Sequence, residues 1–146
     1  FLLMKKLLVL LCMSVSVMGF SQEWGGVDKN TVTMKEVAPT WPGCESKSGA
    51  GTDACFKQKL AQHIGKNFKY PAEAWKNNEQ GKVIVEFMIT ENGTVDIKNI
   101  SGGTASLQEE AKRNIMLIPK MKKPGMLAGK PKAIKYTVPF DFKTGK

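Results

Sequence analysis

The feature that most constrains this fold is an alternating apolar stretch followed by a tight-turn signal. Apolar side chains occupy every second position from Val83 to Ile89, so they lie on one face of an extended strand. An Asn-Gly pair at 92–93 follows, and this dipeptide is favoured in tight hairpins. The return strand is predicted to run from Val95 towards Ile100. A hairpin with one apolar face needs a covering layer.

Two amphipathic helices are predicted to supply that layer. In the first, apolar residues recur every four positions from Phe56 to Phe68, after a Thr-Asp pair at 52–53 that can cap a helix. Ser106 and Glu109 have the spacing of a capping box at the start of the second helix. The apolar stripe of this second helix consists of Leu107, Ala111, Ile115 and Ile118.

The last element is another alternating stretch, predicted as a strand over 132–142. One face carries Ile134, Tyr136, Val138, Phe140 and Phe142, and the aromatic members are expected in the core. The opposite face carries Lys135, Thr137, Pro139 and Asp141. Pro139 has no N–H to donate, which places this strand at a sheet edge. The expected fold class is α+β, a small antiparallel three-stranded sheet with two helices packed on one face.

The N-terminal residues have the pattern of an export signal. Lysines at 5–6 precede an apolar stretch over 7–20, and the small residues Gly19 and Ser21 fit cleavage before Gln22. The stretch is shorter than the roughly 20 residues of a membrane helix, and an uncleaved inner-membrane anchor is the alternative. The expected organisation is a signal peptide over 1–21, a leader over 22–43 with a short strand at 32–37, and a domain over 44–146.

Removal of the signal leaves two of the three cysteines, Cys44 and Cys55. The segment between them, 45–54, is polar and Gly-rich. An even cysteine pair in an exported protein predicts a disulfide, which for a short loop contributes about 2–3 kcal/mol. Zinc ligation by both cysteines and His63 is the weaker alternative, because three scattered ligands lack the paired spacing of zinc sites. No metal or cofactor is therefore predicted.

Positive charge is concentrated in the last third of the chain. Residues 98–146 hold 11 Lys and Arg against 3 acidic residues, within a formal net charge of +9. Such a surface is able to attract anionic envelope polymers or lipid. Export, and the absence of aromatics interleaved with the lysines, argue against nucleic acid. An enzyme is not predicted, because the chain has one His and no recognisable phosphate loop or paired acids.

Short motifs between residues 55 and 142 form a more specific pattern through their order and spacing. They are Tyr70-Pro71-Ala72-Glu73-Ala74, the stretch 81–87, Asn92-Gly93-Thr94-Val95, Ala111 with Arg113, Pro119, Pro124-Gly125, Gly129-Lys130-Pro131 and the stretch 136–142. In this pattern the chain resembles the TonB C-terminal domain family. With its Cys44 and Cys55 pair, it resembles a variant of TonB-like proteins in Bacteroidetes-type bacteria.

The resemblance implies a partner and a binding mode. Members of the family grip outer-membrane TonB-dependent transporters from the periplasm and accept the extended TonB box by strand addition. An edge strand suits this role, because its free N–H and C=O groups pair with a guest backbone. The TonB box or plug of such a transporter, or another envelope protein, is the expected partner. The expected contact residues are Tyr70, Pro71, Lys130, Lys132, Lys135, Thr137, Pro139 and Asp141.

A signal that leads almost directly into the domain predicts a free binding module, periplasmic or secreted, and not a force-transmitting protein. Two other functions remain open. The edge that accepts a peptide also accepts a second copy, which gives a homodimer or a self-associating structural module. The basic last third predicts, alternatively, salt-sensitive binding of anionic envelope polymers.

Overall fold

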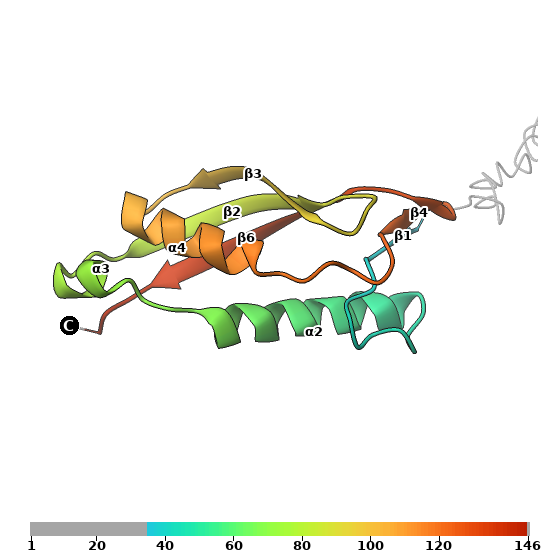
Figure 1. Cartoon of the computed structure of the whole chain (residues 1–146), viewed down its shortest axis with the longest axis horizontal. Coiled ribbons are helices and arrows are strands. Elements are labelled where there is room, and N and C mark those ends of the chain that lie inside the picture. Colours follow the sequence, from blue (N-terminus) through green and yellow to red (C-terminus); the bar gives the residue numbers. More distant parts are fainter. Residues whose placement is uncertain (1–34, 146) are drawn as a thin grey trace, which may run out of the picture. The chain divides into compact units, whose positions relative to one another are not determined.

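A computed structural model describes residues 35–145 (Figure 1). Its main sheet has three antiparallel strands in the order β3-β2-β6, with β2 (Gly81–Ile89) between β3 (Val95–Ser101) and β6 (Ile134–Phe142). The turn between β2 and β3 has Gly93 at a φ of 79°, a left-handed conformation that glycine adopts without strain. The hairpin predicted from the Asn-Gly pair is therefore confirmed.

Two long helices, α2 (Ala50–Asn67) and α4 (Ala105–Met116), cover the apolar face of this sheet, and a short helix, α3 (Ala72–Lys76), follows α2 (Figure 1). The three-stranded α+β arrangement predicted from the sequence is confirmed. Both helices contribute to one core with the inward side chains of β2 and β6. Fully buried members of this core are Phe56, Leu107, Ala111, Ile115, Val83, Val85, Phe87, Ile89 and Phe142. Burial of each of the Val, Leu, Ile and Phe side chains among them contributes roughly 1.5–3 kcal/mol.

The predicted cap of the first helix is wrong. α2 begins at Ala50 after Gly49, so Thr52 and Asp53 lie inside the first turn and neither caps it. Thr52 is buried, and the Asp53 carboxylate accepts the backbone N–H of Ala38 at 2.7 Å. A short polar side chain that is able to cap a helix also satisfies a donor elsewhere in the chain, and here the distant donor is preferred.

The capping box predicted for the second helix is also wrong. α4 follows Thr104, and no side-chain hydrogen bond caps it. The Thr104 hydroxyl instead donates to the Glu79 carboxylate at 3.2 Å. The Gln108 amide donates to the Gly102 carbonyl at 2.8 Å, so side-chain bonds to the preceding loop and to Glu79 secure this end of the helix.

A second, smaller sheet was not predicted. It has the order β1-β4-β5, formed by β1 (Glu36–Val37), β4 (Met126–Leu127) and β5 (Lys130–Pro131). Strands of two residues carry no periodic pattern that a sequence could reveal. β1 falls at the end of the strand expected over 32–37, and Lys35 is not part of it. Residues 32–34 and the predicted signal peptide lie outside the described residues.

The final strand is shorter than predicted. β6 begins at Ile134, not at Lys132, whose N–H donates to the Gly125 carbonyl at 2.8 Å. Lys130–Pro131, just before the predicted start at Lys132, form β5, which pairs with β4. The burial pattern of β6 alternates as expected, with Phe140 and Phe142 in the core and Tyr136 half-buried.

The predicted disulfide is confirmed. Cys44 and Cys55 are bonded, and this ties the segment before α2 to the first turns of that helix. Trp41, 5% exposed, packs edge-to-face on Phe56 with ring centroids 5.7 Å apart. The zinc alternative is excluded because both thiols are in the disulfide and the His63 ring bonds to the Asn114 carbonyl at 2.9 Å. None of the helices formed by residues 35–145 is long and apolar enough to cross a bilayer.

Candidate functional site

The free side of β6 is the main feature that this fold offers to a partner. All nine residues of β6 pair in one continuous register with β2, from Ile134 opposite Ile89 to Phe142 opposite Gly81. Within the described part of the chain, no strand pairs with the other side of β6. The edge position predicted from Pro139 is therefore confirmed. This edge exposes main-chain donors and acceptors over about 30 Å of strand.

The proline also indicates which groups point outward. Pro139 lies opposite Ile84 and has no N–H, so this pair cannot exchange two hydrogen bonds. Antiparallel pairs alternate between bonded and non-bonded, so alternate residues of β6 share one direction. We therefore expect the N–H groups of Lys135, Thr137 and Asp141 to point to the free side. The side chains of these residues are exposed, on the face that the helices do not cover.

The opposite edge of the sheet, β3, is protected by two local features. The register between β2 and β3 shifts between Glu86 and Phe87, where a β-bulge interrupts the pairing. Lys98 and Asp96 form an exposed ion pair at 2.6 Å on this strand. Bulges and charged side chains are devices that keep an edge strand from pairing with other chains. β6 carries no register shift and is the more receptive edge.

Tyr70 and Pro71 lie at the C-terminal end of β6. The Tyr70 ring contacts Phe142 edge-to-face at 5.6 Å and Trp75 at 5.3 Å, and its hydroxyl donates to the Glu79 carbonyl. Burial, and the Glu79 carboxylate, raise the pKa of Tyr70. Phe68 also contacts Phe142, at 5.2 Å. Because Phe68 and Trp75 are 36% and 42% exposed, the edge ends at a partly exposed aromatic cluster.

A buried carboxylate supports the segment that carries the Tyr-Pro pair. Glu110, 8% exposed, accepts two hydrogen bonds from Arg113 at 2.7 Å and one from the Lys69 N–H at 2.8 Å. Arg113 also donates to the Asn67 carbonyl at 2.6 Å, and its hydrogen bond to Glu110 raises the pKa of its guanidinium. Sequence reasoning missed Glu110, although its spacing of three from Arg113 on a helix was a usable signal.

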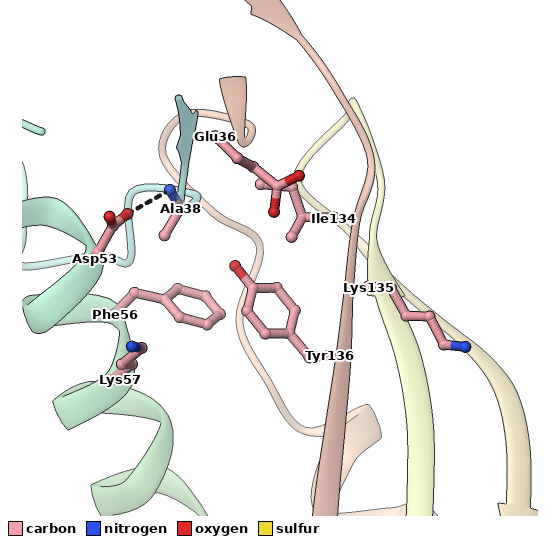
Figure 2. Close-up of a pocket in the computed structure, with 8 residues that line it drawn as sticks. All are labelled: Glu36, Ala38, Asp53, Phe56, Lys57, Ile134, Lys135 and Tyr136. Carbon is pink, nitrogen blue, oxygen red and sulfur yellow. Dashed lines mark hydrogen bonds between the residues drawn. The ribbon is translucent and has the colours of Figure 1, made fainter. Parts of the chain in front are cut away.

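A cavity of about 200 Å³ lies at the N-terminal end of β6 (Figure 2). Its lining consists of Glu36, Ala38, Asp53, Phe56, Lys57, Ile134, Lys135 and Tyr136. Phe56 and Tyr136 stack with centroids 4.7 Å apart, and Figure 2 shows the Tyr136 hydroxyl directed into the cavity. Sequence reasoning placed Tyr136 in the core and missed this site. The available signal was a hydroxyl in a row that otherwise holds Phe and aliphatic residues.

The three predicted lysines gather at this same end of the edge. Lys130 is in β5 and Lys132 follows it, while Lys135 is in β6. Lys132 lies 3.8 Å from the Glu36 carboxylate, and Lys135 lies 3.6 Å from Glu86. The predicted residues therefore fall into three groups, with the lysines at one end of β6, the Tyr-Pro pair at the other and three strand residues between them. Thr137, Pro139 and Asp141 lie between them.

Candidate metal ligands do not cluster in residues 35–145. No group of three or more His, Cys, Asp or Glu side chains that is able to hold a metal ion occurs among these residues. The structure instead defines a class of protein, an α+β module with an open edge strand on a three-stranded antiparallel sheet.

Comparison with known proteins assigns the family. The family model described as Gram-negative bacterial TonB protein C-terminal matches residues 66–144, more than half of the 146-residue chain. The chain belongs to the TonB C-terminal domain family. Domains of this family are non-catalytic, periplasmic modules of TonB-dependent transport that interact with outer-membrane transporters.

Two solved structures are similar to this chain, and both are NMR solution structures of the Helicobacter pylori TonB C-terminal domain. The first, residues 179–285, is 21% identical, with 70% of this chain and 89% of that chain covered and a TM-score of 0.44. The second, residues 194–285, is 25% identical, with 62% and 96% covered and a TM-score of 0.42. No curated protein matches the chain.

Proposed function

We propose that this chain is a periplasmic binding module that accepts an extended segment of an outer-membrane TonB-dependent transporter, its TonB box or plug, by strand addition along β6. The observation that carries the proposal is the free side of β6. Nine residues in one register, with no described strand on the outer side, form a template for a guest backbone.

Main-chain hydrogen bonds would supply a sequence-independent part of the affinity. Each such bond contributes a net free energy of about 0.5–1.5 kcal/mol, so a few of them support weak, reversible binding. Pro139 has no N–H to donate to a guest strand. The guest backbone would therefore be bound mainly by the residues of β6 before and after Pro139. Reversible binding suits a module that must release its transporter after each encounter.

Side chains at the two ends of β6 would set the position of the guest. The partly exposed rings of Phe68 and Trp75, next to Tyr70, offer apolar contact at the C-terminal end. Lys130, Lys132 and Lys135 lie at the other end and would steer an acidic plug segment towards the edge. Exposed charges act on the association rate more than on affinity, and two of these lysines already pair with carboxylates.

The disulfide supports an oxidising location. Disulfides persist in the periplasm and in secreted proteins, whereas cytoplasmic reductants remove them. The Cys44–Cys55 bond therefore favours the exported location that the signal-like N-terminus predicts. Cleavage before Gln22 remains part of this proposal, and mass spectrometry of the exported protein tests it.

The experiment is an NMR titration with a synthetic peptide that carries the TonB box of a transporter from the same organism. We expect shifts concentrated in β6 and in Tyr70, with β3 unaffected. Thr137→Pro, which removes one expected outward N–H, should weaken binding, whereas Thr137→Ala keeps that N–H and should bind normally. Shifts absent from residues 134–142 would reject strand addition.

Self-association through the same edge is the competing outcome. A second copy would pair with β6 through the same groups that accept a peptide. Sedimentation of the peptide-free protein at several concentrations distinguishes the two. A monomer that does not depend on concentration supports the transporter proposal, and a dimer that dissociates when the peptide is added identifies the edge as shared.

A further inference from the structure

The cavity at the N-terminal end of β6 lies where a guest strand would place a side chain. Successive side chains of a strand point to opposite faces of the sheet, so every second guest side chain would face α2. Next to Ile134 and Tyr136, the space between the β6 edge and α2 is this cavity (Figure 2). A water occupies about 30 Å³ of liquid, so a cavity of about 200 Å³ has room for one long side chain.

The polar groups that face this cavity are mostly hydrogen-bond acceptors, namely two carboxylates and a phenol oxygen. One oxygen of Asp53 accepts the Ala38 N–H, which leaves the second oxygen available. The Glu36 carboxylate is about half exposed and pairs with Lys132 at 3.8 Å, a long and exposed ion pair that a guest cation is able to replace. No hydrogen bond joins the Tyr136 hydroxyl to another residue in the described range 35–145.

The two lysines that line this cavity, Lys57 and Lys135, do not fill it. Figure 2 shows Lys135 directed away from the cavity, and it lies 3.6 Å from Glu86 on the far face. Lys57 is exposed on α2. Burial first, and then the Glu36 and Asp53 carboxylates, raise the pKa of Tyr136.

We propose that this cavity is a subsite for one basic side chain, lysine or arginine, of the extended peptide that pairs with β6. This inference rests on the proposed function and adds a sequence preference to it. The aliphatic stem of the guest side chain lies along the stacked rings of Phe56 and Tyr136, and its head group binds Asp53, Glu36 and the phenol oxygen. Aromatic faces and carboxylates together favour a cation over an apolar or acidic side chain.

The disulfide and the Asp53 bond keep the wall of this subsite in place. Glu36 and Ala38 belong to the segment before α2, and Cys44–Cys55 and the Ala38–Asp53 bond hold this segment against the helix. The subsite is therefore built from three parts of the chain, this segment, α2 and β6. Variants must leave these supports intact, and Asp53→Asn preserves the acceptor for Ala38.

The test uses the TonB-box peptide described above, with each residue in turn replaced by Lys, Gln or Glu, on the unmodified protein. At one position we expect the Lys peptide to bind about fivefold more tightly than the Gln peptide in low salt, and the Glu peptide to bind more weakly. Glu36→Gln and Asp53→Asn should each reduce this preference. Glu91→Gln, the same change in the exposed turn after β2, should leave it unchanged.

Each outcome decides the inference. A Lys preference that Glu36→Gln reduces, with shifts at the Tyr136 ring, supports it. If the Lys, Gln and Glu peptides all shift the β6 amides equally, the subsite is contradicted but strand addition is not. Nuclear Overhauser contacts from residues 22–34, or from a second copy, to Tyr136 in the peptide-free protein overturn it because the cavity is then already filled. No β6 shifts with any peptide overturn strand addition and the subsite together.

Discussion

The Asp53 carboxylate accepts the backbone N–H of Ala38 at 2.7 Å, and this bond closes the segment before α2 onto the first turn of the helix. The Cys44–Cys55 disulfide joins the same two parts of the chain. Between these two links lies Trp41, which is buried against Phe56. The segment is therefore an integral part of the module, and it forms one wall of the cavity beside β6.

Loss of the Asp53 acceptor should destabilise the protein. Asp53→Ala leaves the Ala38 N–H without its partner in a partly buried position, so we expect the free energy of unfolding to fall by about 1–2 kcal/mol. Asp53→Asn keeps a side-chain oxygen and should lose less. Urea denaturation measures both. A stability change in Asp53→Ala no larger than that of Glu91→Ala, in an exposed turn, would contradict this role.

Removal of the disulfide should destabilise the protein without abolishing the fold. The bond closes a loop with a sequence separation of 11, for which chain entropy accounts for about 2–3 kcal/mol. In the double variant Cys44→Ser/Cys55→Ser we expect a loss of this size in denaturant unfolding. The core of β2, β6, α2 and α4 remains, so the far-ultraviolet circular dichroism should persist. An unchanged unfolding midpoint is the contrary result.

Neutralising Glu110 should lower the free energy of unfolding far more than neutralising its neighbour Glu109. Glu110→Gln replaces a buried carboxylate that binds Arg113 and the Lys69 N–H, and we expect a loss of about 1.5–3 kcal/mol. Glu109→Gln is the matched control, because Glu109 is exposed on the same helix. Equal unfolding midpoints for the two variants would show that the network does not support the Tyr70 segment.

The pKa of Tyr136 predicts a loss of stability at high pH. Below pH of about 10 the phenol is neutral in both states and contributes no pH dependence. Above this pH the unfolded chain ionises first, because burial and two carboxylates raise the pKa in the folded state. The free energy of unfolding then falls by up to about 1.4 kcal/mol per pH unit for one such group. Tyr136→Phe should make the free energy of unfolding fall less steeply between pH 10 and 11. Parallel curves of this free energy against pH for the two proteins would contradict a raised pKa of Tyr136.

Local sequence patterns predicted the elements in which apolar residues recur at regular intervals. The alternation from Val83 to Ile89 and that of β6 were readable because each strand buries one face, and the Asn-Gly turn is a local signal. β4 and β5 were not readable, because strands of two residues carry no period. β1 lies within the strand expected over 32–37, but its pairing with the distant β4 could not be read from the sequence. The predicted caps were wrong because the Asp53 carboxylate binds the Ala38 N–H and because α4 begins at Ala105, one residue before Ser106.

The candidate site was predictable in its backbone and not in its side chains. Pro139 placed β6 at an edge, which is a consequence of one missing N–H. The cavity depends on Glu36, Asp53 and Tyr136, which are brought together only by folding. A sequence shows a tyrosine in an apolar row, but it does not show that the hydroxyl points at two carboxylates.

The most direct test of the central claim is a titration with two N-methylated forms of the same TonB-box peptide. One form is methylated at its odd positions and the other at its even positions. In strand addition only alternate guest N–H groups point at β6, so we expect one form to lose the β6 amide shifts and the other to retain them. Equal binding of both forms would contradict pairing of the guest backbone with β6.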